Sequence, residues 1–144
     1  MIFELSGNYP ATLDEKGRIH IPSDIKTMLG GNKILRLSDW GACLVAYPEE
    51  SFKTMSASLL ELRKDKEKRK KANRIISQFF LCAIKNGKLL IPQQLREGIK
   101  LNKKIQVVGN TDHIQIWNQQ DWVKQESEFG KTTIQDDLDE LGLM

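Results

Sequence analysis

The stretch "DEKGRIHIP", Asp14–Pro22, places an aspartate and an arginine four residues apart around a glycine. Across a tight turn a carboxylate can hold a guanidinium, either as a structural cross-strand pair or so that the arginine is oriented toward a ligand. An oriented guanidinium can donate two parallel hydrogen bonds to guanine, and Lys16 at the turn tip can contact a phosphate. The residues of this stretch alone leave both interpretations open.

A second copy of this stretch follows seventy positions later as "IKNGKLLIP", Ile84–Pro92. An ungapped alignment of residues 12–52 with 82–122 keeps the glycine and the proline, and preserves apolar character at alternating positions. A constant offset over about forty residues indicates an internal repeat. Two copies are too few for a solenoid, so we expect them to pair with each other.

Each copy is predicted to form a β-hairpin, a short helix and a pair of strands. Gly17 supplies the positive φ of the first turn, and Asn86-Gly87 is a strong signal for a two-residue hairpin. Ser23 is expected to cap the first short helix and Gly30-Gly31 to end it, whereas the second helix should be shorter or frayed. One unit of about forty residues cannot bury a stable core. We therefore predict an α+β fold in which two halves exchange strands around a pseudo-twofold axis and form an interleaved β-barrel.

Helical segments are expected between and after the two copies. Between them, apolar residues recur at helical spacing on both sides of a charged run, which predicts two helices or one interrupted helix with a break near Arg63–Asp65. We interpret the charged run as a solvated helix face with a secondary role in phosphate contact or subunit packing. The predicted division is a first repeat at 1–52, a helical segment at 53–78, a second repeat at 79–122, and a C-terminal helix with an acidic mobile tail at 123–144.

The net charge of +3 is unevenly distributed along the chain. From Gln125 onward six acids accompany one base, so the first 124 residues carry a net charge of about +8. A basic body with an acidic tail is typical of proteins that bind a polyanion, although such charges also serve solubility. The N-terminus does not resemble a signal peptide and no apolar run reaches membrane-spanning length, so we expect a cytoplasmic protein with no membrane contact.

The sequence does not indicate catalysis or metal binding. Cys43 and Cys82 lie in apolar runs outside any CxxC motif, which favours reduced thiols in the core. His20 and His113 have no partner at metal-ligand spacing, and no P-loop, Rossmann glycine set or nucleophile elbow occurs. We expect no enzyme, no cofactor, no metal and no small-molecule substrate.

The stretch "LDEKGRIHIP" resembles the DxKGRxxIP signature of the MraZ family, regulators of bacterial division and cell-wall gene clusters. The resemblance continues through the second hairpin, "QLRE", "VVGN", "IQIW" and a Trp-bearing helix, and so covers nearly the whole chain. It implies tandem AbrB-like (SpoVT-AbrB) swapped-hairpin halves in a ring-shaped homo-oligomer. It also implies a nucleoid-associated protein that binds direct repeats of a short G-rich box in its own promoter. With this resemblance we favour contact with double-stranded DNA, and the expected contact residues are Thr12, Asp14, Lys16, Arg18, Lys85, Asn86 and Lys88.

The second copy departs from the signature at two positions. Ile84 stands where the family has Asp, and Lys88 stands where it has Arg. Because a lysine cannot make the bidentate contact of an arginine, we expect the first hairpin to read sequence and the second to supply charge and positioning. The leading hypothesis is a sequence-specific DNA-binding transcriptional regulator that acts as a repressor. The alternatives are an AbrB-like antitoxin or interaction module that binds a protein partner, and an assembly scaffold.

Overall fold

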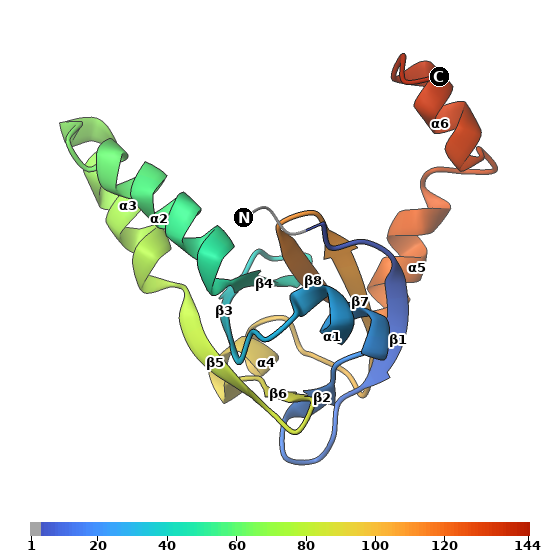
Figure 1. Ribbon diagram of the computed structural model, residues 1–144, viewed down its shortest axis with the longest axis horizontal. Coiled ribbons are helices and arrows are strands. Elements are labelled where there is room, and N and C mark those ends of the chain that lie inside the picture. The colour runs from blue at the N-terminus through green and yellow to red at the C-terminus, as the bar shows by residue number, and fades with distance from the viewer. Residues whose placement is uncertain (1–3) are drawn as a thin grey trace.

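The computed structural model describes residues 4–144, so the first three residues of the expected first repeat lie outside the described part of the chain (Figure 1). The strands are β1 (Asn8–Thr12), β2 (Arg18–His20), β3 (Ile34–Asp39), β4 (Leu44–Pro48), β5 (Phe80–Lys85), β6 (Lys88–Leu90), β7 (Lys104–Asn110) and β8 (His113–Asn118). The helices are α1 (Ser23–Leu29), α2 (Glu49–Leu62), α3 (Lys66–Ser77), α4 (Gln93–Gly98), α5 (Gln119–Ser127) and α6 (Ile134–Glu140).

The strands form one antiparallel sheet that curls into a nearly closed barrel. Their order is β1-β7-β8-β4-β3-β5-β6-β2. In the described part of the chain, one isolated bridge between Leu13 and Ile19 connects the two ends of this sheet. Exchanging the two repeats maps this cyclic order onto itself, as a pseudo-twofold axis requires.

The two repeats alternate around the barrel in pairs of strands. The first strand of each repeat pairs with the third strand of the other, as β1 with β7 and β5 with β3. The remaining partners across the axis are equivalent strands, β2 with β6 and β4 with β8. The predicted interleaved barrel is confirmed.

The core inside the barrel is shared equally by the two repeats. Fully buried side chains occur at positions related by the repeat, such as Ile19 with Leu89 and Leu35 with Ile105. Ile25 of α1 and Leu95 of α4 close the same core. Neither repeat encloses a core of its own, which agrees with the expectation that forty residues are too few to do so.

The short helices differ from the prediction in one detail. Pro22 occupies the N-cap position of α1, with φ −53° and ψ 140°, and Ser23 is already the first helical residue. The predicted Ser23 cap is therefore wrong, because the fixed φ of the proline sets the turn into the helix and no side-chain cap bond forms. Gly30 ends α1 with a φ of 62°, as expected. The helix α4 has six residues against seven in α1, so it is the shorter of the two, as predicted.

The longer helices lie outside the barrel (Figure 1). The pair α2 and α3 breaks at Arg63–Asp65, where predicted, and the Asp65 side chain caps α3 by accepting a hydrogen bond from the Glu67 N–H at 2.9 Å. The helix α5 packs on β7 and β8, and α6 follows it. No helix among residues 4–144 is both long enough and apolar enough to cross a membrane.

Candidate nucleic-acid interface

The antiparallel pair β2–β6, a two-stranded ribbon within the eight-stranded sheet, exposes a largely polar face to solvent. Ile19 and Leu89 point inward and are fully buried, so the residues on either side of them point outward. Across the ribbon Arg18 lies opposite Leu90, and His20 lies opposite Lys88. Because β2 belongs to the first repeat and β6 to the second, this face is assembled from both.

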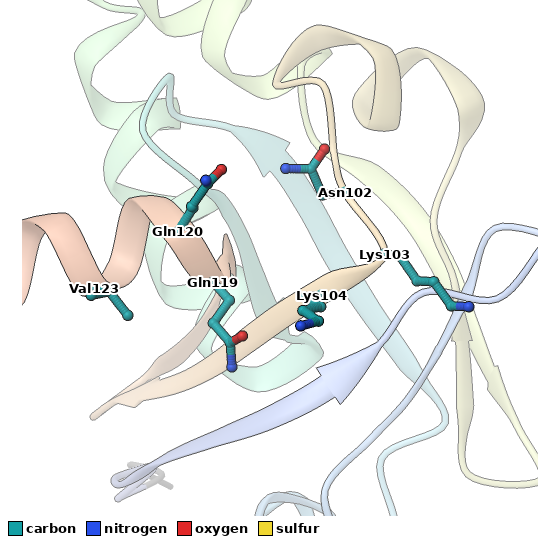
Figure 2. Close-up of a pocket in the computed structure, with 6 residues that line it drawn as sticks. All are labelled: Asn102, Lys103, Lys104, Gln119, Gln120 and Val123. Carbon is teal, nitrogen blue, oxygen red and sulfur yellow. The ribbon is translucent and has the colours of Figure 1, made fainter.

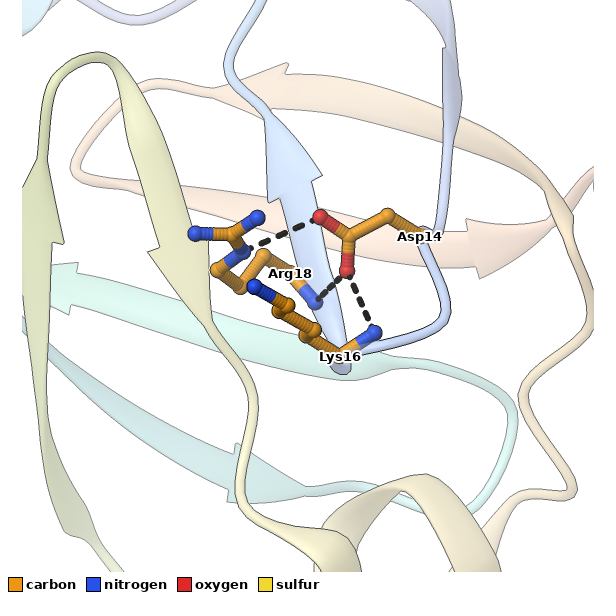
Figure 3. Close-up of polar contacts among 3 residues, drawn as sticks. All are labelled: Asp14, Lys16 and Arg18. Carbon is orange, nitrogen blue, oxygen red and sulfur yellow. Dashed lines mark hydrogen bonds and ion pairs between the residues drawn. The ribbon is translucent and has the colours of Figure 1, made fainter.

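The first turn is a three-residue loop held by Asp14 (Figure 3). The Asp14 N–H donates to the Arg18 carbonyl at 2.8 Å, and the Gly17 N–H donates to the Asp14 carbonyl at 3.1 Å. The Asp14 Oδ1 accepts from the N–H groups of Lys16 and Arg18, each at 2.9 Å. Its Oδ2 accepts from the Arg18 Nε at 3.0 Å. One carboxylate thus fixes both the loop backbone and the arginine side chain.

This arrangement leaves the end of the Arg18 side chain available. The Nε is bound to Asp14, whereas the terminal guanidinium nitrogens have no protein hydrogen-bond partner within residues 4–144. The side chain keeps 36% of its surface exposed. The pKa of Asp14 is held below its ordinary value, mainly by the hydrogen bond from the Arg18 backbone N–H. The Arg18 guanidinium lowers this pKa further. The carboxylate is therefore ionised at neutral pH and holds an arginine that can still donate two parallel hydrogen bonds.

The second turn has a different construction. Lys85 and Lys88 pair directly, and the loop consists of Asn86 and Gly87 with φ values of 53° and 75°. This is the two-residue hairpin that the sequence predicted. Ile84 packs against the barrel core where Asp14 stands in the first repeat, so no carboxylate at that position holds Lys88.

The two turns lie at opposite ends of the β2–β6 ribbon, and each is bonded to the residue that follows the other strand. The Ile91 N–H donates to the Gly17 carbonyl and the Ile21 N–H to the Gly87 carbonyl, each at 2.9 Å. The structure brings four of the predicted contact residues to one hollow, which is lined by Arg18, Lys85, Asn86 and Lys88 together with Ala83 and Leu90.

The other predicted residues surround this hollow. Asp14 is bound to Arg18, and Lys16 is exposed at the loop tip. Thr12 lines a separate hollow with His20, Lys26 and Gly87. It also faces Lys104 across the β1–β7 pair.

Two further basic residues, which were not among the predicted contact residues, belong to this surface. The Arg96 Nε donates to the Ile91 carbonyl at 2.9 Å, and the Arg96 guanidinium carbon lies 2.6 Å from where a Cβ on Gly17 would be. Lys26 has the equivalent position in the other half, 3.5 Å from a Cβ on Gly87. Both residues are basic and align with each other in the repeat, which is the signal that could have identified them.

A further polar hollow lies between the start of β7 and α5 (Figure 2). It is lined by Asn102, Lys103, Lys104, Gln119, Gln120 and Val123. Lys104 is the strand partner of Thr12, so the two lysines of this hollow lie beside the end of β1.

Known proteins resemble this chain over most of its length. The family model described as "MraZ protein, putative antitoxin-like" matches residues 5–74 and 85–141. A transcriptional regulator MraZ from Thermoanaerobacter pseudethanolicus is 33% identical over 96% of this chain and 99% of its own length. The protein of the same name from Clostridium acetobutylicum is 34% identical over 95% of this chain and 98% of its own. The one from Lactiplantibacillus plantarum is 32% identical over 85% and 87%.

Proposed function

The chain belongs to the MraZ family, and on this premise we propose that it regulates transcription by binding double-stranded DNA through the outer face of the β2–β6 ribbon. The observation that carries the proposal is the Asp14–Arg18 pair. It orients an exposed guanidinium on a two-stranded ribbon and leaves its terminal nitrogens unbound by protein in the described chain. A two-stranded ribbon fits the major groove, and an arginine that donates to guanine O6 and N7 is the commonest specific contact there.

The two halves of the ribbon have different proposed roles. Arg18 reads guanine, whereas Lys85, Asn86 and Lys88 of the second turn contact phosphates and set the register. Lys16 and Thr12 contact the sugar-phosphate backbone of the DNA beside the first turn. The basis of this division is that Asp14 holds Arg18, while Ile84 offers Lys88 no equivalent bond.

The proposed target is a set of direct repeats of a short G-rich box in the promoter of the protein's own division and cell-wall gene cluster, where the protein acts as a repressor at the nucleoid. One ribbon contacts few base pairs and binds weakly alone. A ring of identical copies that meets boxes at helical-turn spacing gains affinity through effective concentration. We therefore propose a homo-oligomer as the DNA-binding form.

The test is fluorescence-anisotropy titration of the full chain on the duplex upstream of its own gene and on a scrambled duplex, across a salt series. A preference for the promoter that persists at moderate salt is the expected result. Equal binding that falls steeply with salt would refute specific recognition of this promoter and leave only phosphate attraction. Absence of binding to both duplexes would refute the DNA-binding function and favour a protein partner.

A further inference from the structure

A partly apolar groove lies where α2 and α3 meet the barrel. Its floor is formed by the buried Leu59 and Phe79, and its walls include Met55, Trp40 and Ile75. Trp40 and Ile75 keep 50% and 41% of their surface exposed. An open apolar groove of this kind is typical of a surface that another helix covers.

The side of the groove that α3 forms is basic. The helix α3 carries six bases and one acid, and Arg74 itself lines the groove. Lys71 precedes Arg74 by one helical turn and lies on the same side of α3. One carboxylate, Asp39, also lines the groove, and its Oδ1 accepts a hydrogen bond from the Gly41 N–H at 2.8 Å. The occupant that fits is a helix with an apolar stripe and a negative charge.

The helix α6 has those properties. Ile134 and Leu138 of α6 and Leu141 at its C-cap recur at helical spacing, and Ile134 and Leu141 are 75% and 72% exposed. The remaining face contains four carboxylates and no base. Thr133 and Asp136 close a capping box at its first turn, so the helix forms without a partner. In the single chain Ile134 and Leu141 are exposed and Leu138 is half-buried.

The position of α6 indicates that its partner groove belongs to another copy. Figure 1 shows α6 on one side of the barrel and the α2–α3 pair on the opposite side. Both project from the end of the barrel away from β2 and β6, so contact between them leaves the ribbon free.

We propose that α6 of one copy docks into the α2–α3 groove of the next copy, head to tail. Ile134, Leu138 and Leu141 cover the apolar floor and walls, and the carboxylates of α6 face Arg74 and the basic side of α3. A head-to-tail contact that closes on itself builds a ring, and one that does not close builds a filament. The inference rests on the homo-oligomer in the proposed function and identifies the contact that forms it.

The test compares full-length variants by sedimentation velocity. Ile75→Glu places a charge in the groove, and Leu141→Glu places one on the apolar stripe of α6. Leu60→Glu is the matched control, because Leu60 is 57% exposed on α2 but does not line the groove. We expect wild type and the control to form the same oligomer, and each of the other two variants to sediment as a monomer at the same concentration. An equal mixture of these two variants should form dimers, because one intact groove and one intact α6 remain per pair.

The outcomes separate this contact from the rest of the proposal. Wild-type-like oligomers of both variants would overturn the docking contact while the homo-oligomer stands. Two monomeric variants that stay monomeric when mixed would also overturn the head-to-tail pairing. A monomeric wild type would overturn the oligomer and this contact together, and the DNA-binding part would still be decided by anisotropy on a single box.

Discussion

Replacing Arg18 with lysine should remove sequence preference while keeping affinity for DNA in general. Asp14 binds the Arg18 side chain through Nε alone, so the two terminal guanidinium nitrogens remain available to a DNA base. A lysine keeps the positive charge but cannot donate two parallel hydrogen bonds. It also has no planar group that Asp14 could hold in one orientation. A bidentate arginine–guanine pair contributes about 1–3 kcal/mol of discrimination, which corresponds to a loss of about 5- to 150-fold in the specificity ratio.

The assay is the ratio of dissociation constants for promoter and scrambled duplexes, measured by anisotropy across the salt series. Because the charge is unchanged, Arg18→Lys should bind the scrambled duplex as wild type does and with the same salt slope. Lys88→Arg is the matched control, since it introduces the bidentate group at the turn where Ile84 provides no carboxylate, and it should leave the ratio unchanged. A wild-type ratio in Arg18→Lys, or an equal loss in both variants, would refute the assignment of base readout to Arg18.

Three further outcomes follow from the same geometry. Lys88→Ala should weaken binding to both duplexes alike and reduce the salt slope by about 0.9, as expected for one lost phosphate contact; a loss confined to the promoter duplex would contradict this. The pKa of Asp14 is lowered, so its bonds are fully present above its ordinary value of 3.8 and are lost only as pH falls below it. The difference in promoter preference between wild type and Asp14→Asn should therefore stay constant from about pH 8 to 5, and a difference that disappears near pH 6 would exclude this origin. Gly109→Ala should lower the melting temperature, because the added methyl would collide with the backbone of Leu5 and Ser6, at a typical cost of about 1–3 kcal/mol; Gly31→Ala, where the methyl meets nothing within 4 Å, should not.

The barrel was predictable because the repeat constrained it. Apolar residues at alternating positions give each of the two aligned copies one sheet face that must be buried. Because a unit of about forty residues is too small to bury such a face alone, the two copies must share a core. The turns could also be predicted from the sequence. Asn86-Gly87 adopts the two-residue hairpin, and Asp14 and Arg18 pair across the first turn, as one interpretation of their spacing required. Local chemistry determined these features, so local sequence was enough.

Features that depend on packing between the repeats were not predictable. Arg96 lies over Gly17 of the other repeat and bonds the Ile91 carbonyl, a contact that no local pattern contains. The pairing of β2 with β6 places Arg18 in the same hollow as Lys88, although seventy positions separate them. The Ser23 cap failed for a local reason, because Pro22 before it already set the direction of the chain.

The two ends of the β2–β6 ribbon differ, although the topology alone would allow them to be identical. Two identical strands around a twofold axis would present the same residues in both directions, and such a surface matches a palindrome. Here one end of the ribbon carries an arginine held by a carboxylate, and the other carries lysines around a shorter loop. Because the two halves are joined in one chain, each could change alone. A ribbon with two unlike ends distinguishes the two directions along a duplex, and copies of it in a row suit sites that all point the same way.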